Sequence, residues 1–340
     1  MVSRPGVRVA WLFALLVPTT LSAQDPAPAP STAQEPEFAA VVEKWLASDQ
    51  VDRDALDKTV AALLKDQRAG IAWLGAQIPA AQQKPAEPRS KGILSLVSHA
   101  TLAVLERTRA TNIVFVGQYD TLAPLQPVVG ELLFAWLVDT PDWYPSTHRI
   151  HLTAPLRDLM PKPPTPERVE AIEQIAADEH EPEALRRATA AMAWQWGKKA
   201  NAQKVLAGLN AATAEGDSED RVQATLELAD FLVLLREYKQ AANTHRAAQK
   251  LAQDAKVTLR PIAWYAAACV HALLGDVDRG IAALEQCAKL QASPDLDPSL
   301  RMARSMFDTD PELQALRGHA RWRELVDLAC KSSGPDKVGR

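Results

Sequence analysis

The segment HRIH places two histidines, His148 and His151, three residues apart. On a helix they would share one face, where two imidazole side chains can bind Zn²⁺. Pro145 and Pro155 flank the segment and argue against a regular helix, and a zinc ion needs two further donors that the sequence does not place nearby. We therefore expect these histidines to lie on the surface or to anchor a loop, and we predict no metal site.

Other reactive side chains also have simple structural explanations. His180 lies in the charged run DEHEPE at 178–183. A metal site there is disfavoured because neighbours in sequence point in different directions, and we expect the run to be a solvated turn. Cys269 and His271 are two residues apart on a predicted helix and do not face each other, which disfavours a nucleophilic pair. The sequence contains no HExxH, GxSxG, GxGxxG or Walker motif. We predict a protein that is not an enzyme, with no catalytic residue and no cofactor.

An aromatic pair, Trp143 and Tyr144, lies in the proline-bounded segment DTPDWYPSTHR. Exposed aromatic side chains of this kind form binding hot spots for a peptide or a sugar, whereas buried ones would hold the loop against the helical body. The polar neighbours of the pair are Asp142, His148 and Arg149. A second hypothesis is therefore an enzyme or carbohydrate-binding protein with its site in 111–160, in which these polar groups converge in a pocket.

The first 23 residues resemble a secretory signal peptide rather than part of the fold. Arg4 and Arg8 precede an apolar run, Val9–Val17, and a small-residue cleavage site follows. The run is too short for a bilayer, which needs about 20 residues. We expect residues 1–23 to be removed and the protein to be exported to the periplasm or the extracellular space, with residues 24–37 as a disordered Pro/Ala-rich linker.

The net charge argues against nucleic acid and anionic lipid as partners. Loss of the signal peptide removes two arginines, so 36 basic side chains remain against 42 acidic ones, a net charge of −6. A mildly acidic chain has no overall attraction to nucleic acid or anionic lipid. We expect a protein or peptide partner, no nucleic acid, and no transmembrane segment in the mature protein.

Three cysteines, Cys269, Cys287 and Cys330, are too few for a disulfide scaffold, and the odd number leaves at least one unpaired in a monomer. Cys269 and Cys287 lie on opposite helices of one predicted hairpin. The inward position is Ala268, so Cys269 is turned about 100° away from the partner helix. A disulfide between the two is disfavoured but stays open.

Helical elements are expected through most of the chain, because apolar residues recur at helical spacing. We predict a mainly helical N-terminal region at 38–161, for which no family can be named. Within it, the proline-rich stretch 79–92 is predicted to be a loop, 112–117 a short strand and 127–139 a buried helix. A proline-rich connection follows, and we place the main domain boundary at 160–165.

Two kinds of helical repeat are expected after this boundary. Residues 162–217 contain three predicted helices, the first started by Thr165 and Pro166, and they are similar to HEAT-type repeats. Residues 218–330 resemble tetratricopeptide repeats, most clearly in WYAAACVHALLGDVDRGIAALEQCAKL. The residues that carry the resemblance in this unit are Trp264, Ala267, Ala268, His271, Gly280, Leu284, Cys287 and Pro294. Those of the preceding unit are Leu228, Ala229, Leu232, Ala241, His245 and Ala248.

Small residues in these units fit helices that cross closely, where larger side chains would separate them. Gly275 is expected to end the first helix with a positive φ. The distance from Ala241 to Gly280 is 39 residues rather than the usual 34, which predicts a small insertion between the units, at 253–261. A partial unit beginning at Asp310 resembles the segment that closes such arrays, with Trp322, Leu325 and Val326 lining its last helix, and 331–340 is expected to be a flexible tail.

The resemblance implies an all-α helical-repeat solenoid whose concave face binds an extended peptide or a partner helix. The first helix of each unit would line that face, with Arg236, Arg260, Tyr265 and His271 as contacts. We therefore expect an exported interaction module or scaffold. A third hypothesis, a structural spacer in an envelope assembly, predicts no deep groove.

Overall fold

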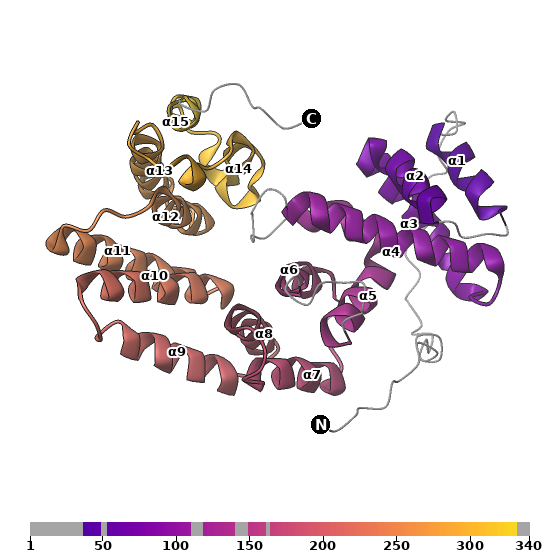
Figure 1. Cartoon of the computed structure of the whole chain (residues 1–340), viewed down its shortest axis with the longest axis horizontal. Helices are drawn as coiled ribbons and strands as arrows, with labels where there is room; N and C mark the ends of the chain where they lie inside the picture. Colours follow the sequence, from indigo (N-terminus) through magenta and orange to yellow (C-terminus); the bar gives the residue numbers. More distant parts are fainter. Residues whose placement is uncertain (1–36, 49–52, 110–117, 140–148, 161–163, 332–340) are drawn as a thin grey trace. The chain divides into compact units, whose positions relative to one another are not determined.

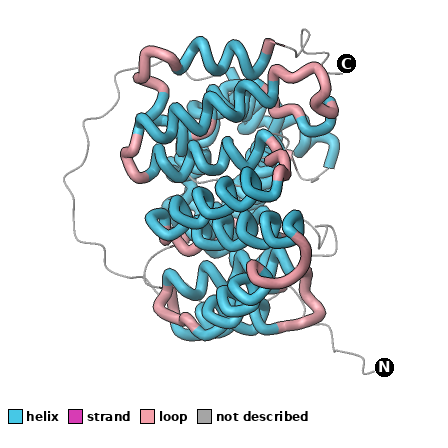
Figure 2. The backbone as a smooth tube through the Cα atoms, turned by 90° about the vertical axis from the view of Figure 1, so that its left-hand side faces the viewer, coloured by secondary structure: helices cyan, strands magenta, loops and turns pink. Residues whose placement is uncertain are grey.

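The structure, a computed structural model, describes residues 37–48, 53–109, 118–139, 149–160 and 164–331. Within these ranges every regular element is a helix and no strand is present (Figure 2). The predicted all-α, helical-repeat fold is confirmed. The predicted signal peptide, nearly all of the linker, the predicted strand and the aromatic pair Trp143 and Tyr144 lie outside the described residues.

Figure 1 shows the helices in their order along the chain. The α-helices are α1 Glu37–Leu46, α2 Arg53–Leu63, α3 Gln67–Gln83, α4 Pro88–Arg109, α5 Gln126–Val138, α6 Ile150–Leu159, α7 Pro166–Ala177, α8 Glu183–Gln195, α9 Ala200–Ala212, α10 Ser218–Leu234, α11 Tyr238–Ala255, α12 Pro261–Leu273, α13 Val277–Gln291, α14 Arg304–Thr309 and α15 Trp322–Cys330. The short 3₁₀ helices are η2 Leu64–Asp66, η3 Gln118–Leu125, η5 Pro298–Leu300 and η6 Pro311–Leu316.

The N-terminal compact unit ends at Ala100. In it, both guanidinium nitrogens of Arg89 at the start of α4 bind the carboxylate of Glu43 on α1, at 2.5 and 2.6 Å. The loop predicted at 79–92 is much shorter than expected: Pro79 lies inside α3 and Pro88 is the first residue of α4. A proline at the first helical position loses no hydrogen bond, because that N–H would be unpaired in any case.

The second compact unit begins at Thr101, so the chain does not divide at the boundary expected at 160–165. Contacts cross that position: α6 packs against α8, and Arg149 binds Glu181 at 2.6 Å. The predicted loop after residue 139 also contains a helix, α6, with Pro155 inside it. The proline removes one backbone hydrogen bond, and the burial of Leu152, Leu156 and Leu159 compensates for the loss.

Three successive hairpins, α8–α9, α10–α11 and α12–α13, repeat the same backbone turn. The first helix of each ends at a residue with positive φ, at Gly197 (89°), Arg236 (63°) and Gly275 (72°). Each of these N–H groups donates to the carbonyl three residues earlier, at 3.0, 2.9 and 2.9 Å. The next N–H donates to the carbonyl five residues earlier, at 2.9 Å in all three turns. The positive φ predicted for Gly275 is confirmed.

The side chains repeat in the same register. Positions 197, 236 and 275 are each 39 residues apart, and so are two sets of buried small residues. The first set, on the first helices, is Ala190, Ala229 and Ala268, each 0 % exposed. The second set, on the second helices, is Ala202, Ala241 and Gly280. The spacing of 39 is therefore the period of this array. The sequence predicts a 34-residue repeat interrupted by a small insertion, and the constant spacing shows no such interruption.

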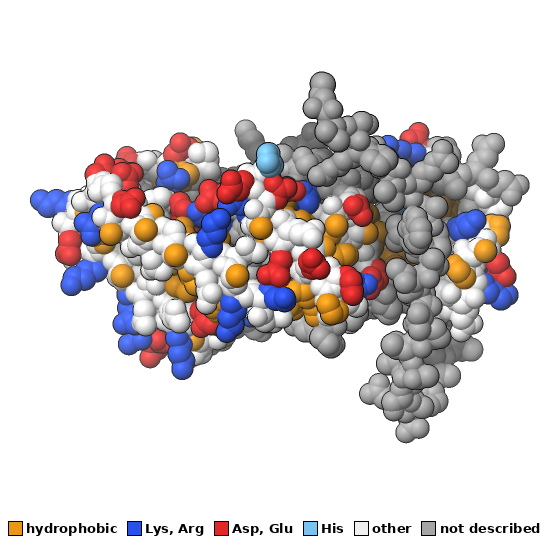
Figure 3. Space-filling view, turned by 90° about the horizontal axis from the view of Figure 1, so that it is seen from below, with side chains coloured by type: hydrophobic (Ala, Val, Ile, Leu, Met, Phe, Trp, Pro, Cys, Tyr) orange, Lys and Arg blue, Asp and Glu red, His pale blue; other side chains and the backbone are white. Residues whose placement is uncertain are grey.

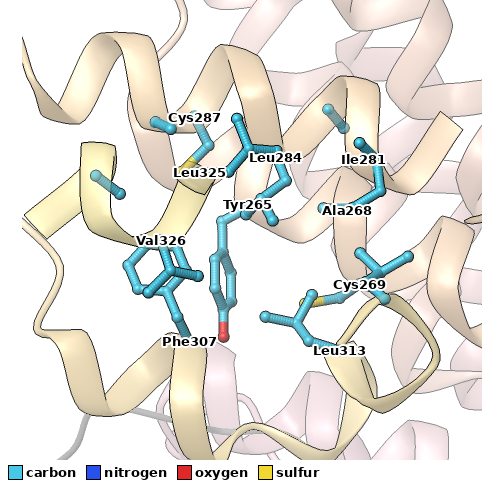
Figure 4. Packing of buried hydrophobic residues seen from close by; sticks show 14 of the residues in the cluster. Tyr265, Ala268, Cys269, Ile281, Leu284, Cys287, Phe307, Leu313, Leu325 and Val326 are labelled. Atoms are coloured by element: carbon cyan, nitrogen blue, oxygen red, sulfur yellow. The ribbon is translucent and has the colours of Figure 1, made fainter. Parts of the chain in front are cut away.

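The C-terminal segment closes the last hairpin. η6 packs on α12, and α15 packs on α13. A Cβ added at Gly280 would lie 2.7 Å from Leu316 Cδ2, so this position has no room for a side chain where it meets η6. Trp322, Leu325 and Val326 are buried, as predicted for the closing unit. Figure 4 shows the ring of Tyr265 among side chains of this segment, including Phe307, whose ring centroid is 5.5 Å away.

Candidate functional site

A groove of about 750 Å³ opens between α11 and α13, the second helices of two neighbouring hairpins. Its volume is within the range of about 300–1,000 Å³ that is typical of ligand sites. We call it the α11–α13 groove. The lining residues are Arg246, Gln249, Lys250, Ala252, Gln253, Val257, Thr258, Leu259, Trp264, Gln286 and Leu290.

Helical spacing brings the polar lining residues together. On α11, Arg246, Gln249, Lys250 and Gln253 follow the i, i+3, i+4, i+7 pattern of a single helix face. On α13, Gln286 lies one turn before Leu290. The α11–α12 connection supplies the remaining lining, from Val257 to Leu259, because α11 ends at Lys256 with a left-handed residue that turns the chain.

The floor of the groove is apolar. Leu259 is buried and Trp264 is partly buried, and both belong to a small cluster with Val222 and Ala252 that joins α10, α11 and α12. Trp264 also packs against the larger C-terminal core. A tryptophan held from two sides is a rigid surface on which a ligand side chain can pack with little loss of entropy.

The rim of the groove is basic. Arg246 and Lys250 are both exposed, and no acidic side chain lines the groove. Arg246 donates to the neutral amide oxygen of Asn243, and neither cation pairs with a carboxylate among the described residues. Like charges at i and i+4 repel each other and slightly destabilise a helix, so an anionic ligand would relieve an unfavourable contact.

The first helices of the hairpins, by contrast, satisfy their charges among themselves. Arg187 on α8 binds Glu183 on its own helix and reaches Glu227 on α10 at 3.1 Å. The side-chain amide of Gln195 on α8 donates to the carbonyl of Leu234 on α10 at 3.1 Å. These contacts link neighbouring hairpins, and they pair Arg187 with two carboxylates of that face.

Two of the predicted contact residues are buried rather than exposed. Tyr265 is 0 % exposed and belongs to the core, and His271 is buried, with its Nδ1 3.5 Å from Asp276. Arg236 and Arg260 are exposed, but Arg236 lies in the turn after α10, and Arg260 lies directly before α12. Because α10 and α12 are both first helices of their hairpins and run in the same direction, the C-terminal end of α10 and the N-terminal end of α12 are at opposite ends of the hairpins. The predicted set does not form one site.

Tyr265 instead binds a buried acidic group. Its hydroxyl donates to Asp310 Oδ2 at 2.5 Å and lies 3.0 Å from the carbonyl of Met306. Asp310 Oδ1 accepts the backbone N–H of Glu312 at 2.9 Å, and the Cys269 thiol is 3.8 Å from Oδ2. Burial raises the pKa of Cys269 and that of Asp310, while the hydrogen bond from Tyr265 lowers the latter.

This cluster has donor atoms suited to a cation. One ligand atom each from Cys269, Asp310 and Glu312 lies within 4.8 Å of the others. Both oxygens of Asp310, however, already accept protein donors, and the residue starts η6 as its N-cap. The arrangement is explained as a structural tie between α12 and the closing segment.

The polar pocket expected near the aromatic pair has only part of its residues in the described structure. Arg149 is 7 % exposed and donates to the carbonyl of Leu137 and to Glu181. His151 lies on α6, and Asp142 and His148 are outside the described residues. Arg149 therefore has a structural role in joining α5, α6 and the start of α8. No disulfide joins Cys269 and Cys287, which answers the question that the sequence left open.

No protein-family model and no curated protein matches this chain. Among the described helices, none is long and apolar enough to cross a membrane.

Sequence reasoning missed the α11–α13 groove because it assigned binding to the first helices. The available signal was the stripe Arg246, Gln249, Lys250, Gln253, which is polar throughout on a helix whose buried positions are mostly alanine.

Proposed function

We propose that this protein is an exported, non-enzymatic interaction module or scaffold of the tetratricopeptide-repeat type, and that it binds a peptide segment of a partner protein in the α11–α13 groove. The groove itself carries this proposal, because it combines an apolar floor with unpaired cations and amides. Sites that recognise a peptide need both parts, an apolar anchor position and polar groups that fix the orientation.

The repeat architecture supports the helical-repeat part of this proposal. Three hairpins in a constant 39-residue register, with alanine or glycine at each helix crossing, are what a helical-repeat array requires. The signal-peptide pattern of residues 1–23 supports export. The absence of catalytic sequence motifs supports a function in binding rather than in catalysis.

Two alternatives are less well supported. A structural spacer predicts no deep groove, and the α11–α13 groove argues against it. An enzyme or carbohydrate-binding site in 111–160 needs Arg149 as a free polar group, whereas Arg149 is buried in contacts within the fold.

Site-specific photo-cross-linking tests the proposal. A benzoylphenylalanine at Gln286, which is exposed and lines the groove, should form adducts with a limited set of proteins in an envelope extract of the producing cells. The same probe at Gln240, exposed on α11 outside the groove, is the matched control. Excess unlabelled mature protein should suppress the Gln286 adducts. Equal adducts at both positions, or none at Gln286, would contradict peptide binding in this groove.

A further inference from the structure

We infer that the segment bound in the α11–α13 groove is acidic, with two carboxylates placed against Arg246 and Lys250 and an aliphatic or aromatic side chain between them and Trp264. This inference rests on the proposed function, since it specifies the chemistry of the partner at the same site. It is drawn from the charge and the layout of the lining residues.

Charge complementarity is the first argument. Several arginines and lysines of the described residues are matched by a nearby carboxylate, for example Arg304 by Asp308 and Asp327, and Lys289 by Glu285. Arg246 and Lys250 lie one helical turn apart with no such partner in the described structure, and no acid lines the groove to oppose a ligand. Opposite charges on a ligand would be attracted at the rim, and like charges would be repelled.

The layout of the groove is the second argument. The cations lie on α11, whereas Trp264, Leu259 and Leu290 provide the apolar surface from α12, its preceding loop and α13. A ligand must therefore have carboxylates on one side and an apolar side chain on the other. The amides of Gln249, Gln253 and Gln286 each offer a donor and an acceptor, which suits a polypeptide backbone.

A peptide fits these observations better than a nucleic acid does. The mature chain has a net charge of −6, which weakens the attraction of any polyanion. On the face shown in Figure 3, the acidic and basic side chains of the described residues are interspersed, without the continuous basic surface that a phosphate backbone follows. Two cations in a groove match a short acidic segment.

Selection from a displayed library of random octapeptides tests the inference, with the mature full chain as bait. Peptides that bind should be enriched in Asp and Glu beside Leu or Phe. The double variant Arg246→Glu, Lys250→Glu should weaken the selected peptides by at least about tenfold, because it replaces two attractions by two repulsions. The charge-retaining variant Arg246→Lys, Lys250→Arg should bind nearly as the unmodified chain does. The matched control is Lys204→Glu, Arg323→Glu, which changes two exposed cations outside the groove and should leave binding unchanged.

Each failure of the test has its own meaning. If peptides bind and Gln286→Trp blocks them, but they are not acidic and charge reversal has no effect, the acidic partner is wrong and the groove function stands. If no peptide depends on the groove residues, both the inference and the proposed function fail. If an oligouridine RNA binds more tightly than every selected peptide and depends equally on Arg246 and Lys250, the partner class is wrong.

Discussion

The imidazole of His245 is 1 % exposed, and neither of its ring nitrogens has a hydrogen-bond partner among the described residues. Burial, with a smaller contribution from His271, lowers its pKa to about 4. The equivalent positions of the neighbouring hairpins, 39 residues away on each side, are Leu206 and Leu284. His245 therefore places a polar group in a site that the rest of the array fills with leucine.

Acid should destabilise the protein through His245. Below pH 6.5 the unfolded chain protonates this histidine, whereas the folded chain does so only near pH 4. In that interval the unfolded state binds more protons than the folded state. The free energy of unfolding therefore decreases as the pH is lowered, by about 3 kcal/mol in total. His245→Leu should remove most of this dependence in denaturant unfolding at pH 7 and pH 4.5. His180→Leu, at a histidine that is 97 % exposed, is the control. An unchanged pH slope for His245→Leu would contradict the assignment.

The hydrogen bond between Tyr265 and Asp310 should stabilise the closing segment. Tyr265→Phe leaves the buried Asp310 Oδ2 with only the weak Cys269 thiol as a side-chain donor, and should lower the free energy of unfolding by about 1–3 kcal/mol. A double-mutant cycle with Asp310→Asn measures the coupling directly. If the two effects simply add, the two groups do not interact as described.

At the level of the helix ends, the positive φ angles of Gly197 and Gly275 allow a clean test of the repeated turn. A Cβ at either position would meet no atom within 4 Å, so only the backbone conformation resists substitution. Gly197→Ala and Gly275→Ala should each destabilise the protein by about 1 kcal/mol. Gly208→Ala, also without close neighbours but in the interior of α9, should stabilise it by a similar amount through helix propensity. Thermal melts of the three variants should therefore shift in opposite directions.

The helix crossings should be sensitive to bulk in the same register. Ala190→Leu, Ala229→Leu and Ala268→Leu each insert a larger side chain at a position that is 0 % exposed, and each should cost about 1–3 kcal/mol through overpacking. Ala247→Leu, on the exposed face of α11, is the control. An unchanged melting temperature for one of the three would show that its hairpin does not cross at that residue.

Helix type and hairpin packing were predictable because they depend on local spacing. The buried alanines of α10 to α13 and the turn at Gly275 follow from periodicity and from the conformational freedom of glycine. The site was not predictable, since exposure depends on which helix face the next hairpin covers. Tyr265 looked like an exposed contact and is buried only because η6 and α14, far along the chain, pack over it. The helix α6 was missed because a proline normally indicates the end of a helix. Here the burial of the neighbouring leucines compensates for the hydrogen bond that Pro155 removes.

The whole chain divides into two compact units between Ala100 and Thr101, and this division determines which fragments keep their packing contacts. A fragment 101–340 retains α6 against α8 and the ion pair of Arg149 with Glu181, whereas a fragment 162–340 loses both. We expect both fragments to be helical, with the shorter one unfolding at a lower temperature in circular dichroism. Equal midpoints would show that α6 adds nothing to the stability of the hairpins.

The closing segment also gives the array a direction. A hairpin can stack on another only through an open end, and η6 and α15 cover the end formed by α12 and α13, with Leu316 filling the space beside Gly280. A second copy of the chain therefore has no free hairpin surface there on which to continue the stack. Head-to-tail polymerisation, the inherent hazard of a protein built from similar stacked hairpins, is blocked at this end by a few turns of chain.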